Sequence, residues 1–210
     1  MNRLIAALFA LSLASPALAQ PPGSASPVAT GQTAGDTWRV DTTHSSAGFS
    51  VRHMMIATVR GTLGPISGTV EYDGSNIANI KVDISIDVRA INTGNAPRDK
   101  DLRGDGFFDV ERYPSVTFKS KQAQPAGPGI FRLVGDLTMH GVTKEVTLEV
   151  EGPSPAVKVA DGASKIGATA TTRLNRRDYG LDYNELIEAG AVVGDEVTVT
   201  IDIELIKPAP

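Results

Sequence analysis

The sequence predicts an all-β protein, an eight-stranded antiparallel barrel with one short helix in a long loop. Apolar and polar residues alternate along most segments between residues 45 and 206, and most connections between these segments are short. Alternation with a period of two gives a sheet one dry face and one wet face. About eight antiparallel strands of this kind can close into a barrel with an apolar interior. A two-sheet sandwich is the alternative that the pattern leaves open.

The clearest element is a hairpin over residues 131–150 with a tight turn at His140 and Gly141. Folding the chain at this turn sorts the facing pairs by type, and a slip of one residue would exchange the two faces. Lys144 is an exception, because it falls on the apolar face opposite Leu137. We expect it to extend out of the rim or to mark the mouth of a cavity. The apolar pairs are Met139–Val142, Leu133–Leu148 and Phe131–Val150, and the polar pairs are Thr138–Thr143 and Arg132–Glu149.

The other strands follow from the same alternation. The segment 58–72 is interrupted at Gly64-Pro65, which predicts a kink or bulge because proline removes a donor from the ladder. The remaining strands are expected over 45–54, 80–88, 116–118, 166–174 and 197–205.

The long connection after residue 92 is expected to hold the helix, over Pro97–Gly104, with proline early and glycine as the stop. Phe107 and Phe108 follow it. They either cap the barrel end or form the wall of a hydrophobic entrance.

The first residues have the layout of a secretory signal peptide, residues 1–19. Arg3 supplies a positive start, Leu4 to Leu13 an apolar stretch too short to span a bilayer, and Ala17-Leu18-Ala19 a cleavage site. Residues 20–36 are rich in Pro, Gly, Ser, Ala and Thr and are expected to form a flexible linker before a folded domain over 37–207. We therefore expect an exported, periplasmic protein with no stable membrane span. The chain has no cysteine, so it forms no disulfide.

The charge balance excludes a nucleic-acid-binding surface. The net charge is −4, and removal of the one arginine in residues 1–19 makes it −5. Only the segment with Arg173, Arg176 and Arg177 is locally basic, and we interpret it as solvated surface.

Catalytic patterns are weak. The three histidines His44, His53 and His140 are not spaced as ligands on one strand face, so we predict no catalytic residue, no metal and no cofactor. A metal-assisted hydrolase that uses these three histidines is the alternative from another class of function. A barrel with a solid core and a protein partner is a third.

Four stretches resemble the YceI-like family of exported lipid-binding proteins, and together they cover roughly residues 37–207. The chain has Asp101, Gly104 and Glu145 where the family more often has His, Ser and Pro. The stretches are residues 44–53 (HSSAGFSVRH), 98–120 (with RDKDLR, FFDVERYP and TFKS), 135–144 (GDLTMHGVTK) and 174–197 (with LNRRDYG and VGDEV).

The resemblance implies a lipocalin-like barrel whose interior holds a long isoprenoid or similar lipid, such as a polyprenyl phosphate or a quinone. It also implies a non-catalytic carrier or sequestering protein, in some members linked to stress. A homodimer stays open. We expect the polar contacts with the lipid at Arg103, Lys144 and His53, with Arg103 first because a guanidinium grips phosphate in a fork. The expected apolar wall consists of Phe49, Val51, Ile84, Ile86, Phe107, Phe108, Phe118, Leu133, Leu137, Met139 and Ile203.

Overall fold

The computed structural model describes residues 37–184, 186–187 and 190–209. The predicted signal peptide and the predicted linker lie outside the described residues. No helix in the described ranges has both the length and the apolar character that a membrane crossing requires.

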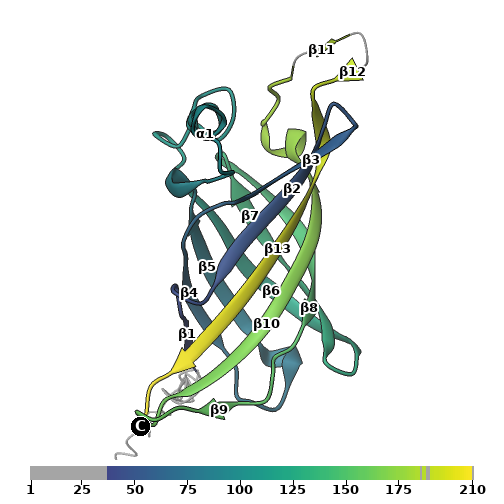
Figure 1. Cartoon of the computed structure of the whole chain (residues 1–210). Helices are drawn as coiled ribbons and strands as arrows, with labels where there is room; N and C mark the ends of the chain where they lie inside the picture. Colours follow the sequence, from purple (N-terminus) through teal and green to yellow (C-terminus); the bar gives the residue numbers. More distant parts are fainter. Residues whose placement is uncertain (1–36, 185, 188–189, 210) are drawn as a thin grey trace, which may run out of the picture. The chain divides into compact units, whose positions relative to one another are not determined.

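The described chain consists mainly of strands (Figure 1). The helix is α1 (Ala96–Arg103), and a 3-10 turn, η4 (Arg176–Tyr179), follows the tenth strand. The strands are β1 (Thr37–Val40), β2 (Ser46–His53), β3 (Ala57–Thr62), β4 (Ile66–Glu71), β5 (Lys81–Asp87), β6 (Ser115–Gly127), β7 (Ile130–Met139), β8 (Val142–Glu151), β9 (Val157–Lys158), β10 (Ser164–Asn175), β11 (Leu186–Ile187), β12 (Gly190–Ala191) and β13 (Val193–Lys207).

The strands close into the predicted antiparallel barrel. Neighbours pair in the order β13-β1-β4-β5-β6-β7-β8-β10, and β10 pairs back to β13 over twelve residues from Ser164↔Lys207 to Asn175↔Glu196. This closure confirms the eight-stranded barrel and rules out the sandwich. It leaves one inner face that must be filled by side chains or by a ligand.

Two of the eight positions in the barrel wall are each occupied by a broken strand. β13 pairs with β1 near its end (Val40↔Leu205) and with β2 before that (Ala47↔Ile201), so β1 and β2 follow the same edge of β13. β4 pairs with β1 and β3 pairs with β2. The break between β3 and β4 falls at the predicted Gly64-Pro65 interruption, and Gly64 has φ 144°. The expected strand 58–72 is therefore confirmed as two aligned strands.

The predicted hairpin is confirmed in its register. β7 and β8 pair as Met139↔Val142, Leu133↔Leu148 and Phe131↔Val150. His140 and Gly141 both have positive φ, 51° and 76°, as a two-residue turn of this type requires. The strand expected at 116–118 is longer than predicted, because β6 continues to Gly127 along β7 with mostly exposed side chains. A strand segment with mostly exposed side chains does not alternate between apolar and polar residues, so the sequence pattern did not indicate it.

The two ends of the barrel differ. We call the end with α1, β11, β12 and the β2–β3 turn the upper end, and the end with β9 and the last residues of β13 the lower end (Figure 1). β5 pairs with β4 on one side and with β6 on the other. At the upper end, β3 forms an isolated bridge, Thr62↔Asn92, to the segment that carries α1. The segment 88–114 thus continues the wall at the upper end. The helix prediction is confirmed, with Asn95 as N-cap and Gly104 as C-cap.

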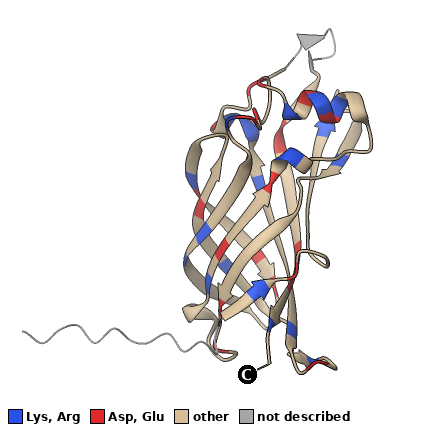
Figure 2. Cartoon of the chain, turned by 90° about the vertical axis from the view of Figure 1, so that its left-hand side faces the viewer, with Lys and Arg blue, Asp and Glu red and all other residues tan. Residues whose placement is uncertain are grey.

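Figure 2 shows that basic and acidic residues are interspersed along the strands and on α1. The inner face is apolar and packs around a core that includes Trp38, Ile66, Ile84, Phe118 and Leu148. The Trp38 indole N–H donates to the carbonyl oxygen of Tyr72 at 3.1 Å, which satisfies its polar atom near the lower end.

Candidate functional site

An apolar cavity of about 110 Å³ lies in the upper half of the barrel. Residues that alternate along the strands point into it, for example Val197, Val199 and Ile201 on β13. The other lining residues are Phe49, Val51, Leu63, Ile84, Ile86, Leu102, Phe107, Phe108, Val116, Thr117, Phe118, Leu137, Met139, Leu148, Thr172, Leu174, Arg176, Leu181 and Val193.

A second apolar cavity, of about 60 Å³, lies in the lower half and includes Phe131, Leu133 and Ile203 in its lining. Four side chains line both cavities and separate them: Ile84, Phe118, Leu148 and Ile201. The interior is therefore hollow but divided. Both volumes are smaller than the roughly 300–1,000 Å³ that is typical of a small-molecule site.

Gly135 on β7 leaves space for the ring of Phe118, one of the four side chains that separate the two cavities. A Cβ at position 135 would lie 2.6 Å from Phe118 Cζ and 2.4 Å from the carbonyl oxygen of Lys119. The ring therefore lies directly against the β7 backbone, and a larger residue at 135 would push it toward the centre.

The segment around α1 forms part of the upper wall and is held by hydrogen bonds. The backbone N–H and the hydroxyl of Thr93 donate to Asp99 Oδ1 at 2.8 and 2.5 Å. These bonds with Thr93 hold the pKa of the Asp99 carboxyl below its usual range. Leu102, Phe107 and Phe108 are thereby positioned along the cavity, and the half-buried Phe107 ring contacts Tyr183 with ring centroids 4.9 Å apart.

Arg176 is the ionisable residue of the cavity lining. Its side chain is 5% exposed, and burial lowers its pKa. The guanidinium donates to the carbonyl oxygens of Gly194 at 3.0 Å and Tyr183 at 2.9 Å, and also to that of Leu181. It joins the two ends of the segment 181–194, which carries β11 and β12, and fixes them over the upper end of the cavity.

Tyr179 and His140 lie beside this anchor. Tyr179 is 2% exposed, and burial raises the pKa of its hydroxyl, which has no hydrogen-bond partner among the described residues. His140 Nδ1 lies 3.1 Å from the carbonyl oxygen of Tyr179, and its ring contacts Tyr113 edge-on with centroids 4.8 Å apart. His140 therefore connects the β7–β8 turn to η4.

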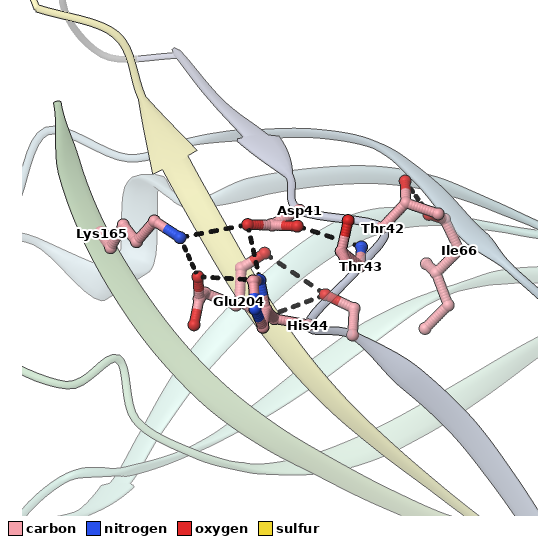
Figure 3. A network of polar contacts seen from close by, with 8 residues as sticks. Asp41, Thr42, Thr43, His44, Ile66, Lys165 and Glu204 are labelled. Atoms are coloured by element: carbon pink, nitrogen blue, oxygen red, sulfur yellow. Dashed lines mark hydrogen bonds and ion pairs between the residues drawn. The ribbon is translucent and has the colours of Figure 1, made fainter. Parts of the chain in front are cut away.

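A polar cluster at the lower end contains the grouping closest to a metal site in the described part of the chain (Figure 3). Ligand atoms of Asp41, His44 and Glu204 lie within 4.8 Å of one another. Lys165 Nζ lies 3.2 Å from Asp41 Oδ2 and 2.6 Å from Glu204 Oε1, so an ammonium group already balances both carboxylates. Hydrogen bonds from His44 and Lys165 strongly lower the pKa of Asp41. The cluster joins β13, β10 and the β1–β2 link.

The three histidines are not brought together. His44 precedes β2 in the lower cluster, whereas His53 ends β2, nine residues further along an extended chain that rises roughly 3.3 Å per residue. His140 lies in the β7–β8 turn and bonds to η4. This separation removes the geometric basis of the three-histidine hydrolase.

The predicted apolar wall falls on the two cavities. Phe107 and Phe108 line the upper one, at the end of the barrel that carries α1. Whether they cap this end or form an entrance stays a prediction. The predicted polar contacts lie outside both linings: Arg103 donates to the carbonyl oxygen of Ile91 at 3.1 Å, and Lys144 extends to Asp178 at 3.6 Å. His53, at the end of β2, is also outside. Whether any of these residues contacts a ligand stays a prediction. The upper cavity receives Phe49, Val51, Ile84, Ile86, Phe107, Phe108, Phe118, Leu137 and Met139, and the lower one Leu133 and Ile203 together with Ile84 and Phe118.

Sequence reasoning missed Arg176, and the interpretation of Arg173, Arg176 and Arg177 as solvated surface is wrong for it. The side chains of Arg173 and Arg177 are 71% and 46% exposed, whereas that of Arg176 is 5% exposed. The carbonyl groups that hold Arg176 come from residues 181–194. The charge pattern around residue 176 does not indicate that these distant carbonyl groups surround its side chain. Arg176 and Arg177 lie in the 3-10 turn η4, so the parity of an extended strand does not distinguish them either.

Comparison with known proteins agrees with this architecture. A family model described as YceI-like domain matches residues 38–205. A UPF0312 protein of Staphylococcus aureus (strain MSSA476) is 32% identical over 153 residues, which cover 73% of this chain and 86% of the relative.

Two solved structures show the same fold. Burkholderia cenocepacia BcnA has a TM-score of 0.68 at 22% identity, over 79% of this chain and 98% of that one. A polyisoprenoid binding domain from Saccharophagus degradans, implicated in plant cell wall breakdown, has a TM-score of 0.59 at 18% identity, over 82% and 98%.

Proposed function

Because the chain belongs to the YceI-like family, we propose that it binds a long-chain isoprenoid lipid, a polyprenyl phosphate or a quinone, inside the barrel without transforming it. The observation that carries this proposal is the apolar lining of the two cavities, in which Arg176 is the ionisable group. The fold shared with a polyisoprenoid binding domain supports it.

Burial of the chain supplies the affinity. Each methylene that leaves water contributes roughly 0.8 kcal/mol, so a chain of several prenyl units needs few polar contacts. The cavity lining offers Arg176 for a polar head, but its guanidinium is already engaged by backbone carbonyls. Specificity therefore depends mainly on the length and shape of the apolar chain.

The divided interior defines what binding requires. A long chain must pass between Ile84, Phe118, Leu148 and Ile201, which now separate the cavities. Side-chain rotation at these four positions joins the cavities without breaking a hydrogen bond, because all four side chains are apolar. We expect the end of the apolar tail to lie in the lower cavity and the polar head to lie near segment 181–194.

We also propose that the protein acts in the periplasm, as the signal-peptide pattern of residues 1–19 predicts, and that it carries or sequesters its lipid under stress. A metal-dependent reaction has no support from the histidines, because the structure separates them. The lower cluster of Asp41, His44 and Glu204 holds a lysine ammonium in place of an ion.

A matched pair of substitutions on one strand tests the proposal. Val199 on β13 lines the upper cavity, whereas its neighbour Thr198 does not. Val199→Trp fills the cavity, and Thr198→Trp adds the same indole on the other face. Geranylgeraniol uptake from detergent-free buffer, measured by mass spectrometry after gel filtration, should fall at least about tenfold in Val199→Trp alone. Equal uptake by the two folded variants and the wild type would place the ligand elsewhere.

A further inference from the structure

The upper end exposes an apolar tip at the turn between β2 and β3. Ile56 is 79% exposed and Met55 is 49% exposed, whereas most large apolar side chains of the described chain are buried. Tyr183, 45% exposed, lies at the same end and contacts Phe107 of the cavity wall. Two further exposed apolar side chains, Ile130 and Val157, lie elsewhere, on β7 and β9. The three at the upper end are adjacent to the cavity wall and are candidates for a contact surface.

The backbone of this turn is strained and firmly held. The register His53↔Ala57 leaves three residues in the turn, and Met54 and Met55 have φ values of 50° and 58°, in the left-handed region that favours Gly and Asn. Two methionines there cost of the order of 1 kcal/mol each. Three bonds fix the turn: Ile56 N–H to His53 O at 3.1 Å, Met54 N–H to Val192 O at 2.8 Å and Arg52 Nη2 to Met55 O at 2.6 Å. The apolar tip is therefore a built feature of the hairpin.

The charge of the hairpin is opposite to that of the protein. Residues 45–70 contain Arg52 and Arg60 and no Asp or Glu, although the whole chain has a net charge of −4. Both arginines are exposed, and neither makes an ion pair among the described residues. Asp195, in the neighbouring segment, is paired with Arg176 and Arg177. An apolar tip above uncompensated arginines matches the layers of an anionic bilayer, in which acyl chains lie beneath phosphate groups.

The tip is continuous with the wall of the upper cavity. His53 pairs with Val193, which lines the upper cavity, and a Cβ at Gly194 would lie 3.4 Å from Met55 Cε. Gly194 is in turn bonded to Arg176 through its carbonyl oxygen. The tip, residues 192–194 and the Arg176 anchor are thus connected.

We propose that the β2–β3 turn docks the upper end onto an anionic phospholipid membrane, with Met55 and Ile56 inserted at the acyl boundary and Arg52 and Arg60 at the phosphates. The upper end of the cavity then faces the bilayer, where a lipid with a long apolar chain dissolves. The docking is carried by the turn and its charge; only the identity of the cargo rests on the proposed function.

The test is binding to vesicles of phosphatidylcholine with and without phosphatidylglycerol, followed by flotation, with protein expressed from the whole gene and purified as the cell processes it. Ile56→Asn should weaken binding roughly tenfold or more, because the bilayer no longer buries an isoleucine. Arg60→Gln should weaken binding several-fold on phosphatidylglycerol vesicles, an effect that disappears in high salt, with no change on pure phosphatidylcholine.

The lower end provides matched controls. Val157 is 61% exposed on β9 and is followed by the exposed Lys158, so Val157→Asn and Lys158→Gln remove the same kinds of group from the opposite end. They should bind vesicles as the wild type does. Absence of wild-type binding, or equal losses at the two ends, would overturn the proposal. A change of oligomeric state in Ile56→Asn with vesicle binding intact would also overturn it, because the tip would then be an interface with a second copy.

A separate measurement distinguishes failure of the docking from failure of the lipid-binding proposal. Ile56→Asn should take up geranylgeraniol from detergent-free buffer as the wild type does, because Ile56 does not line the cavity. If the wild type takes up none while the vesicle results hold, the docking stands and the cargo is different. If uptake is normal and no variant changes vesicle binding, the cavity function stands and the docking is wrong.

Discussion

Replacement of Arg176 by methionine is expected to destabilise the protein by about 2–4 kcal/mol. The bonds to Gly194 and Tyr183, at 3.0 and 2.9 Å, are hydrogen bonds to a charged group, each worth about 1.5–3 kcal/mol. Removal of the guanidinium relieves a burial cost of several kcal/mol, which offsets part of this loss. The loss of the hydrogen bonds outweighs the relieved burial cost, because the carbonyl groups of Gly194 and Tyr183 are left without their common donor. For a domain of this size the melting temperature should fall by about 5–15 °C.

The assay is urea unfolding followed by far-UV circular dichroism, with amide hydrogen exchange over residues 181–194. Arg173→Met is the matched control, because the Arg173 side chain is 71% exposed and lies 3.8 Å from an exposed Glu196. It should change stability by less than about 0.5 kcal/mol. If Arg176→Met is no less stable than Arg173→Met, or if exchange over 181–194 does not accelerate, Arg176 does not hold this segment.

Three further predictions concern the partition, the entrance and the lower cluster. Gly135→Ala should lower the free energy of unfolding in urea by about 1–3 kcal/mol, because the new Cβ would overlap Phe118 and the Lys119 carbonyl group. Gly167→Ala is the control and should lower it by less than about 1 kcal/mol, because the nearest atom to its Cβ would lie at 3.7 Å. Equal losses in the two variants would contradict the packing of Phe118 against Gly135. Phe107→Asp should reduce geranylgeraniol uptake with little change in melting temperature, because Phe107 is only half-buried. Phe131→Ala, in the buried core, should lose about 3–5 kcal/mol of stability. If Phe107→Asp also unfolds the barrel, Phe107 is a core residue and does not form an entrance. Hydrogen bonds from His44 and Lys165 strongly lower the pKa of Asp41 in the folded state, so its stabilising effect is fully present above pH about 4 and declines progressively as the pH falls below that. Asp41→Asn should therefore lower the melting temperature at pH 7 and lower it progressively less as the pH falls from about 4 to about 2. A loss independent of pH, or one matched by the exposed Asp83→Asn, would contradict the ion network.

The parts of the fold that the sequence predicts well are those set by local pattern. The pairing of Leu133 with Leu148 follows from alternation about a single turn, and α1 follows from the early Pro97 and the stop at Gly104. Strand alternation also places Phe49, Val51 and Met139 on the inner face, because every second residue of a closed sheet points inward.

The features that sequence reasoning missed depend on contacts between distant segments. Asp41 meets Glu204 and Lys165 only because β13 lies between β1 and β10. Arg176 is buried because a later segment supplies carbonyl groups to it. Arg103 donates to the carbonyl oxygen of Ile91, and Lys144 extends to Asp178. A contact of either residue with a ligand stays a prediction.

Native mass spectrometry of the protein purified from its own host, with analysis of an organic extract, tests the central claim most directly. The account predicts one bound amphiphile per chain, with a long apolar tail of isoprenoid type, and its loss in Val199→Trp but not in Thr198→Trp. Protein that repeatedly carries no amphiphile, or that carries the same amount in both variants, would contradict a lipid-binding interior.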